Sequence, residues 1–283
     1  MPPPGRYNTS VTTTLRPTAP ELRTEDGGRS RPYEVCVNSR PVGSLTIATD
    51  PRFGPRFGRI AGLVVDERDR HRGRGTVAAL AAEEVLRGWG CTQVSVDVPA
   101  VATTALGLAG ALGYVERSRS LNKPLAAPPA LPPGSTARPL AEEEFAAWHA
   151  AGRAQYVAEW AGRGVPAELA AAKADRDRAR LLPHGAGTPG VVLRVLRHEG
   201  ADVGTLWLAL REEEAYVFEV RVAAAHRGRG HGRTLMHLAE REALAAGGRA
   251  IALSVFAGNT PALRLYESLG YRATEFHLYK ILH

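Results

Sequence analysis

The residues of this chain best suited to chemistry form a glycine-rich turn that reads Arg-Gly-Arg-Gly-His-Gly at positions 227–232. Glycine lets successive backbone N–H groups approach an anion without a Cβ in the way, and the start of a helix adds its positive dipole end. The turn therefore predicts a site for a pyrophosphate group.

The sequence on either side of this turn predicts the elements that hold it. A run of β-type residues, Y-V-F-E-V-R-V, covers 216–222, and an apolar pattern of helical period follows from about 235 to 244. The expected order is strand, glycine turn and helix.

A related turn lies 157 positions upstream, where residues 70–75 read Arg-His-Arg-Gly-Arg-Gly. The same offset pairs Ala-Glu at 82–83 with Ala-Glu at 239–240. It also pairs Leu-Gly-Tyr at 112–114 with Leu-Gly-Tyr at 269–271. Because a chance motif would not extend over a whole subdomain, we interpret the chain as an internal duplication.

Three motifs of the second copy occur in a fixed order. The turn fits Gln/Arg-x-x-Gly-x-Gly/Ala, an asparagine follows at 259, and residues 265–271 fit Leu-Tyr-x-x-Leu-Gly-Phe/Tyr. Each motif alone is weak, but this ordered set resembles the GNAT superfamily of acyl-CoA-dependent N-acetyltransferases. The resemblance covers residues 136–283 well and residues 12–125 partially.

The resemblance implies an α/β fold of two tandem GNAT domains. Each would have a central mixed, mostly antiparallel twisted sheet, flanked by helices and splayed between its strands 4 and 5. We expect a disordered lead-in at 1–11 and a degenerate first domain at 12–123. A stiff, Pro-rich linker at 124–134 would precede a catalytic domain at 135–283.

The resemblance also implies acetyl-CoA as the cofactor, held by the turn and by the strand before it. The backbone of Val220 and Val222 would pair with the pantetheine amides where the strands splay. The expected cofactor-binding residues are Val220, Val222, Arg227, Gly228, Arg229, Gly230, His231, Gly232, Arg233, Asn259 and Tyr266.

Acetyl transfer to an amine needs an unprotonated nucleophile and an acid that protonates the departing thiolate. Tyr266 matches the family's acid, and a phenol with an ordinary pKa of about 10 suits a thiol leaving group. The alternative is a core aromatic. Asn259 would hydrogen-bond the pantetheine arm or the acceptor, or else simply cap the helix that follows. His226 and His231 fall in the turn, where exposed loop histidines are expected.

Glu219 is the candidate general base, acting directly or through water. Strand alternation places its side chain on the face opposite Phe218 and Val220. The alternative is an ordinary polar residue or a ligand of the acceptor amine.

The two copies differ most between their first strand and their strand 3. There the second copy has two additional helical runs, at about 141–163 and 166–182. In the family, such helices wall the acceptor pocket. Trp148, Tyr156 and Trp160 recur at multiples of four, so they fall in one sector of the first run and are expected to line that pocket. The alternative is that they pack on the sheet.

The first copy keeps the turn but lacks the groups for proton transfer. Gly62, Ala102 and Ala109 stand at the positions of the base, the amide and the acid. We therefore expect a non-catalytic domain that binds cofactor at most. The residues of this possible second cofactor site are Val65, Arg70, Arg72, Gly73, Arg74 and Gly75.

Composition bears on partners and location. A net charge of +7 and a pI near 9.8 could suit nucleic acid. The arginines are nevertheless spread along the chain without interleaved aromatic residues, so a polyanionic cofactor and compositional bias explain the charge better. No apolar run approaches the roughly 18 residues of a membrane helix, and no cysteine and histidine spacing predicts a zinc site. Two cysteines favour a reducing, cytoplasmic location.

We therefore predict an enzyme that moves an acetyl group from acetyl-CoA to the primary amine of a small molecule by direct attack on the thioester in the second copy. An amino acid, a polyamine or an aminoglycoside would serve, and a protein lysine or N-terminus is the alternative acceptor. A protein of another class, a non-enzymatic binder of acetyl-CoA or nucleic acid, stays open, although Asn259 and Tyr266 argue against it. We expect no metal, no membrane partner, and a monomer or weak homodimer.

Overall fold

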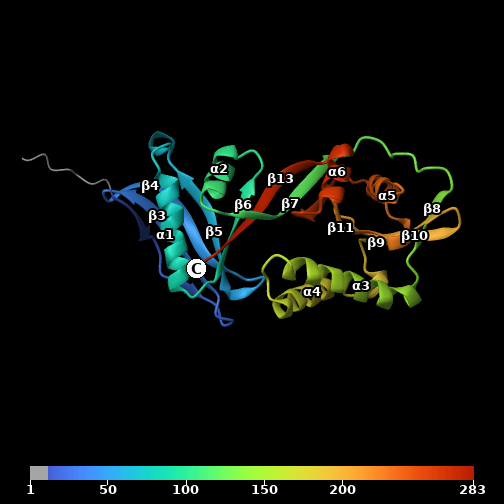
Figure 1. The fold of residues 1–283 in the computed structure, drawn as a ribbon, viewed down its shortest axis with the longest axis horizontal. Coiled ribbons are helices and arrows are strands. Elements are labelled where there is room, and N and C mark those ends of the chain that lie inside the picture. The colour runs from blue at the N-terminus through green and yellow to red at the C-terminus, as the bar shows by residue number, and fades with distance from the viewer. Residues whose placement is uncertain (1–11) are drawn as a thin grey trace, which may run out of the picture. The chain divides into compact units, whose positions relative to one another are not determined.

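The computed structural model describes residues 12–283, and each copy of the repeat supplies most of one unit (Figure 1). Unit 1 holds the chain up to Val98, Ala102–Val115 and Leu278–His283. Unit 2 holds Pro99–Val101 and Glu116–His277. The predicted lead-in, residues 1–11, lies outside the described residues.

The described part of unit 1 is a sheet with two helices. Its elements are β1 (Thr13–Pro17), β2 (Leu22–Arg23), β3 (Arg29–Val37), β4 (Arg40–Asp50), β5 (Gly54–Val65), α1 (Arg74–Gly88), β6 (Gln93–Pro99) and α2 (Thr103–Ala111). The strands lie in the order β1-β3-β4-β5-β6, and only β5 and β6 pair in parallel.

Unit 2 has a larger sheet and two more helices. Its elements are β7 (Val115–Pro124), β8 (Ser135–Pro139), α3 (Glu142–Ala161), α4 (Ala167–Leu181), β9 (Val191–His198), β10 (Ala201–Ala209), β11 (Glu214–Val222), α5 (His231–Ala245), β12 (Ala250–Phe256), α6 (Thr260–Ser268) and the first part of β13 (Arg272–Ile281). The strands lie in the order β13-β7-β12-β11-β10-β9-β8, and from β7 to β8 the one parallel pair is that of β11 with β12. The mixed, mostly antiparallel α/β fold is therefore confirmed.

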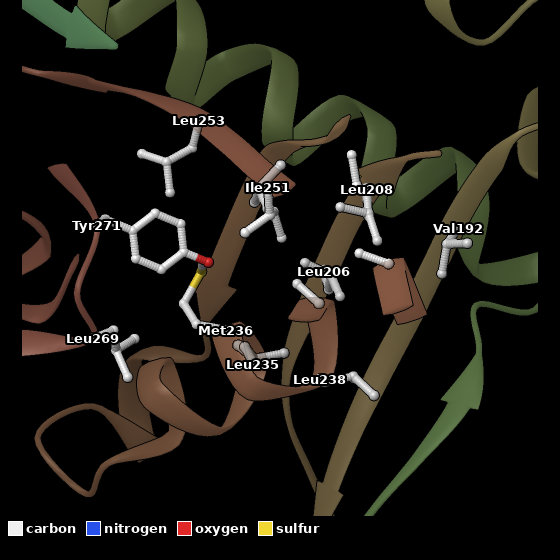
Figure 2. Packing of buried hydrophobic residues seen from close by; sticks show 14 of the residues in the cluster. Val192, Leu206, Leu208, Leu235, Met236, Leu238, Ile251, Leu253, Leu269 and Tyr271 are labelled. Carbon is white, nitrogen blue, oxygen red and sulfur yellow. The ribbon is translucent and has the colours of Figure 1, made fainter. Parts of the chain in front are cut away.

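Alternation along β10 directs side chains of unit 2 to two different cores. Leu206 and Leu208 join the cluster of α5 on one face, where Figure 2 shows them with Leu235 and Met236. Trp207 points to the opposite face and packs with Trp148 of α3. The extra helices of the second copy thus cover one face of the sheet and α5 covers the other.

Both sheets open between their two parallel strands. The parallel pairing of β11 with β12 covers only Glu214–Val217, although β11 continues to Val222. In unit 1, β5 pairs with β6 only over Phe57–Arg59 and continues to Val65. The predicted splay between strands 4 and 5 is confirmed in both copies.

Each unit is completed by the last strand of the other copy. In unit 2, Lys123 of β7 donates to Glu240 of α5 at 2.7 Å. In unit 1, Lys280 near the end of β13 donates to Glu83 of α1 at 2.8 Å. The units therefore differ from the predicted domains at 116–123 and at 278–283, because a sequence pattern identifies a strand but not its distant pairing partner.

The predicted linker packs on unit 2 instead of running as a free spacer. Leu125 and Leu131 lie against the core of α5, and the Leu125 N–H donates to the Arg249 carbonyl at 2.8 Å. None of the helices within residues 12–283 combines the length and the apolar character that a membrane span requires.

Candidate functional site

The glycine turn of unit 2 has the backbone that anion binding requires. Gly228 and Gly230 take positive φ angles of 75° and 84°, and Gly230 caps α5. No atom lies within 4 Å of where a Cβ would stand at either residue. The backbone N–H groups of residues 228–232 donate to no acceptor among the described residues. This open cradle at the start of a 15-residue helix fits a pyrophosphate.

The arginine that opens the turn fixes its shape. Arg227 donates through Nε to the Val222 carbonyl at 3.3 Å, and Arg70 of unit 1 donates likewise to the Val65 carbonyl at 2.9 Å. Gly73 caps α1 with a φ of 73°. The two turns therefore have the same construction.

The last glycine of the turn serves packing. A Cβ at Gly232 would lie 3.2 Å from Leu265 Cδ2 on α6, and one at Gly75 would lie 3.3 Å from Leu108 Cδ2 on α2. Close approach of the two helices, rather than an unusual φ, is what calls for glycine there.

The remaining predicted turn residues separate into exposed and buried side chains. Arg229 and Arg233 are exposed, and Arg233 donates to Ser268 at 2.7 Å. His231 is buried, so the expectation of an exposed loop histidine is wrong for this residue. Its ring centroid lies 5.0 Å from that of His198 at the end of β9. Burial, followed by the nearby His198, His226 and Arg229, lowers the pKa of His231.

The free edge of β11 lies directly before the turn. The Ala223 N–H donates to the Val203 carbonyl at 2.9 Å. Because hydrogen-bonded pairs alternate along an antiparallel ladder, the backbone groups of Arg221 and Glu219 also face β10. The backbone of Val220 and Val222 consequently points to the opposite edge, where β12 no longer pairs. An extended amide chain could add to this edge.

Tyr266 and Asn259 both lie on α6. Tyr266 is half-buried against the core, its ring lies 5.9 Å from that of Tyr271, and burial raises its pKa to about 12. Asn259 is exposed and caps the helix, because its Oδ1 accepts from Ala262 N–H at 3.2 Å. The side-chain amide of Asn259 still carries its N–H groups for a ligand.

Glu219 points toward α3 and α4 because it pairs with Trp207, whose side chain lies on that face, and a bulge in β11 follows directly. The register shifts between Trp207 and Leu208, which face Glu219 and Val217, so Phe218 is the extra residue. Phe218 and Glu219 therefore both turn toward the extra helices, and the expectation of opposite faces is wrong for this pair. Val220 lies on the other face, as expected.

Two arginines that the sequence did not single out flank the Glu219 carboxylate. Arg178 Nη2 of α4 lies 3.8 Å from Oε2, and Arg221 Nη2 lies 3.4 Å from Oε1. Burial raises the pKa of Glu219, against the attraction of Arg221 and Arg178. The sequence pattern that could have identified Arg178 is its four-residue spacing from Ala174 and Ala170, which places it on the buried stripe of α4.

Gly152 of α3 makes room for this ion cluster. A Cβ at position 152 would lie 2.4 Å from Glu219 Oε2 and 2.5 Å from Arg178 Nη2. The helix can approach the carboxylate only because position 152 has no side chain.

A hollow of about 420 Å³ lies beside the cluster, between α3 and the end of β11. Trp148 and Arg221 line its inner part, and Ala223, Ala224 and Arg227 line the part next to the turn. The hollow thus lies between Arg227, which opens the turn, and two residues that lie close to Glu219, Trp148 and Arg221.

The three predicted acceptor aromatics divide into two groups. Trp148 lines the hollow, whereas Tyr156 and Trp160 pack on Phe256 with ring centroids 6.4 and 5.3 Å away. Lys173 of α4 donates to the Tyr156 hydroxyl at 2.7 Å. The structure therefore places only Trp148 beside both Glu219 and the turn.

Unit 1 has the turn without its chemical neighbours. Gly62, Ala102 and Ala109 hold no polar side chain, and the described residues between β1 and β3 form only the short β2. Arg72 is exposed, and Arg74 donates to Thr13 Oγ1 at 3.2 Å. Among residues 12–283, no group of three His, Cys, Asp or Glu side chains is placed to hold a metal ion.

Comparison with known proteins gives the same result for both copies. The acetyltransferase (GNAT) family matches residues 6–114 and 141–271. The chain is 33% identical over 107 residues to the uncharacterized N-acetyltransferase YycN of Bacillus subtilis. The aligned region covers 36% of this chain and 69% of YycN.

Two solved structures share the fold. The GCN5-related N-acetyltransferase from Sphaerobacter thermophilus superposes with a TM-score of 0.57 at 21% identity, over 88% of this chain and 80% of that one. A tandem GNAT protein from the clavulanic acid biosynthesis pathway gives 0.51 at 18% identity, over 92% and 85%. Since the family matches most of the sequence and matches it twice, the chain belongs to the acetyltransferase (GNAT) family and is an acyltransferase built from two copies of its domain.

Proposed function

We propose that unit 2 transfers an acetyl group from acetyl-CoA to the primary amine of a small molecule. The observation that carries this proposal is the open cradle directly after the free edge of β11, with a hollow lined by Arg221 and Arg227 beside it. Bound acetyl-CoA would supply an activated acetyl carbon, and after transfer a thiolate that needs a proton.

Each group of the chain has a role in that arrangement. The free N–H groups of residues 228–232 and the positive end of α5 would hold the pyrophosphate, with Arg227, Arg229 and Arg233 adding positive charge. The backbone of Val220 and Val222 would pair with the amides of the pantetheine arm, as a strand pairs with a sheet edge.

Proton transfer would involve two groups whose pKa values are both raised by burial. Glu219 would accept a proton from the amine, directly or through water, because a raised pKa makes a carboxylate a better base. Tyr266 stays protonated below its pKa of about 12, so it would donate to the thiolate. Asn259 would bind the pantetheine arm or the acceptor through its free N–H groups.

Unit 1 would have no catalytic role and would bind cofactor at most. Its possible second site consists of Val65, Arg70, Arg72, Gly73, Arg74 and Gly75. We also expect a cytoplasmic protein, since Cys36 and Cys91 are buried thiols without a disulfide.

The test is release of free thiol from acetyl-CoA across a panel of amines, with the acetylated product identified by mass spectrometry. We expect a small-molecule amine to give the highest kcat/KM. Faster acetylation of lysine side chains or N-termini of proteins would instead identify a protein acceptor, and no thiol release with any amine would overturn the proposal.

A further inference from the structure

Three buried N–H donors of unit 2 have no hydrogen-bond partner among the described residues. They are Arg178 Nη1, Trp148 Nε1 and Trp207 Nε1, of which Trp148 Nε1 lies close enough to the Glu219 carboxylate to lower its pKa. Only 7% of the Arg178 side chain is exposed, and the two tryptophans are 5% and 4% exposed. The Arg178 guanidinium lies 5.7 Å from the Trp148 ring and 5.3 Å from the Trp207 ring. The three donors therefore belong to one cluster.

Two buried oxygens near these donors also have no hydrogen-bond partner among the described residues, Glu219 Oε1 and the hydroxyl of Thr205, which lies opposite Arg221. Glu219 lies 3.4 to 3.8 Å from its arginines, whereas Arg138 at the surface holds Glu144 at 2.6 Å. A buried donor without a partner destabilises the folded protein, and a charged donor does so more strongly. The cluster therefore has an excess of donors that a ligand could satisfy.

The cluster beside the hollow also carries more positive than negative charge, which favours the same kind of ligand. Arg178 and Arg221 face one carboxylate, that of Glu219. The two acids that line the hollow, Glu144 and Asp202, are balanced by Arg138, which lies 2.6 Å from both, and by Arg197, which lies 3.2 Å from Asp202. The positive charge that remains beside Glu219 favours an anionic group and disfavours a second cation.

We propose that the acceptor is an amine that carries a carboxylate close to its amino group, as an α-amino acid does. Its carboxylate binds Arg178 and Arg221, and its amine faces Glu219. This inference rests on the proposed function of unit 2, whose acceptor class it narrows.

The geometry of guanidinium groups explains why a carboxylate is the fitting anion. A guanidinium presents parallel N–H donors that match the two oxygens of a carboxylate, and such charge-assisted pairs are roughly twice as strong as neutral hydrogen bonds. Trp148 and Trp207 offer two further donors and apolar walls for the rest of the acceptor. Polyamines and aminoglycosides would instead bring additional cations toward two arginines.

The first test compares matched acceptors on the full-length protein. An α-amino acid, its carboxamide and the corresponding decarboxylated amine share one side chain and differ in charge. With kcat/KM expressed per unprotonated amine, we expect the acid to exceed both others by about 100-fold, the value of one well-placed ionic contact. Equal or faster turnover of the carboxamide, of the decarboxylated amine or of a polyamine would overturn the inference.

The second test removes the arginine and uses an exposed arginine of the same helix as its control. Arg178→Met should lower kcat/KM for the acid by about 100-fold more than for the carboxamide, so that the preference disappears even though both acceptors react more slowly. Arg180, whose side chain is 72% exposed, should tolerate Arg180→Met with the preference intact.

The outcomes separate the two proposals. If no amine releases thiol, the proposed function fails. If amines react but the acid has no advantage in the unmodified protein, only the acceptor class is wrong. A preference for the acid that survives Arg178→Met in a folded variant would also overturn the assignment of Arg178.

Discussion

The Nε of Arg227 donates to the carbonyl oxygen of Val222 at 3.3 Å and thereby ties the start of the turn to the strand before it. The same contact in unit 1 is slightly shorter, so both turns are held in shape by the chain itself. A difference in activity between the units must then arise from the side chains around the turns.

Charge introduced into the two turns should therefore have unequal effects. Gly230→Glu places a carboxylate where the pyrophosphate would lie, so we expect acetyl-CoA binding to unit 2 and turnover to be lost. Gly73→Glu should leave turnover within a few-fold. Gly230→Gln carries the same backbone strain at a positive φ without the charge and should retain measurable binding by calorimetry. Loss of activity in a folded Gly73→Glu variant alone would transfer the active site to unit 1.

Removal of the Tyr266 hydroxyl should slow the reaction without weakening the cofactor complex. Tyr266→Phe keeps the half-buried ring, so we expect kcat to fall by about 10- to 1000-fold with an unchanged Kd for acetyl-CoA. Because burial raises the Tyr266 pKa to about 12, its phenol stays protonated at every working pH. An unchanged kcat would assign Tyr266 to the core.

The raised pKa of Glu219 predicts the acidic side of the pH profile. A general base must be unprotonated, so kcat at saturating substrates should fall as the pH drops through this pKa. The fall should occur above the ordinary glutamate pKa of about 4.3. Glu219→Gln should lower kcat and abolish the fall in kcat at acidic pH. Glu212→Gln, at an exposed position, should leave both kcat and its pH dependence unchanged. If kcat of Glu219→Gln still fell at acidic pH, the titrating base would be another group.

Gly152→Ala should lower activity by displacing Glu219 and Arg178 while leaving the stability of the fold almost unchanged. Alanine improves helix propensity by about 1 kcal/mol, and the atoms that it would displace are the ends of two flexible side chains. We therefore expect a melting temperature within a few degrees of the parent and a kcat/KM lower by about 10-fold. The control is Gly162→Ala, since a Cβ there meets its nearest atom at an ordinary 3.4 Å. Equal activity of both variants would show that the ion cluster tolerates displacement.

The strand that unit 2 takes from the first copy predicts which fragments fold. A fragment of residues 116–277 contains β7, which supplies the buried Leu121 and the Lys123 partner of Glu240. We expect it to unfold cooperatively on heating. A fragment of residues 135–277 lacks β7 and should be unfolded or aggregated, because it exposes the edge of β12 and leaves Glu240 without its cation. A folded 135–277 fragment would contradict the strand assignment.

Local features of the site could be read from the sequence because they depend on residues close together in the chain. The glycines of the turn, the proline after Asn259 and the apolar period of α5 each specify a local conformation. The order of strand, turn and helix was predicted for that reason.

Features that depend on distant partners could not be read in this way. A bulge at Phe218 inverts the expected face of this residue relative to Glu219, and nothing in the alternation of β11 announces it. Arg178 becomes part of the site only because the fold brings α4 within 3.8 Å of Glu219 on β11. The pairing of β7 with β12 likewise joins segments that are far apart in sequence.

The contribution of residues 278–283 to unit 1 also has a consequence for the timing of synthesis. All of the residues of unit 2 leave the ribosome before residue 278 does, so unit 2 can close its sheet first. Unit 1 begins earlier, yet Glu83 can form its ion pair only after Lys280, almost two hundred residues later in the chain, has been synthesised. The last residues of unit 2 therefore emerge before those that complete unit 1, although unit 1 begins earlier.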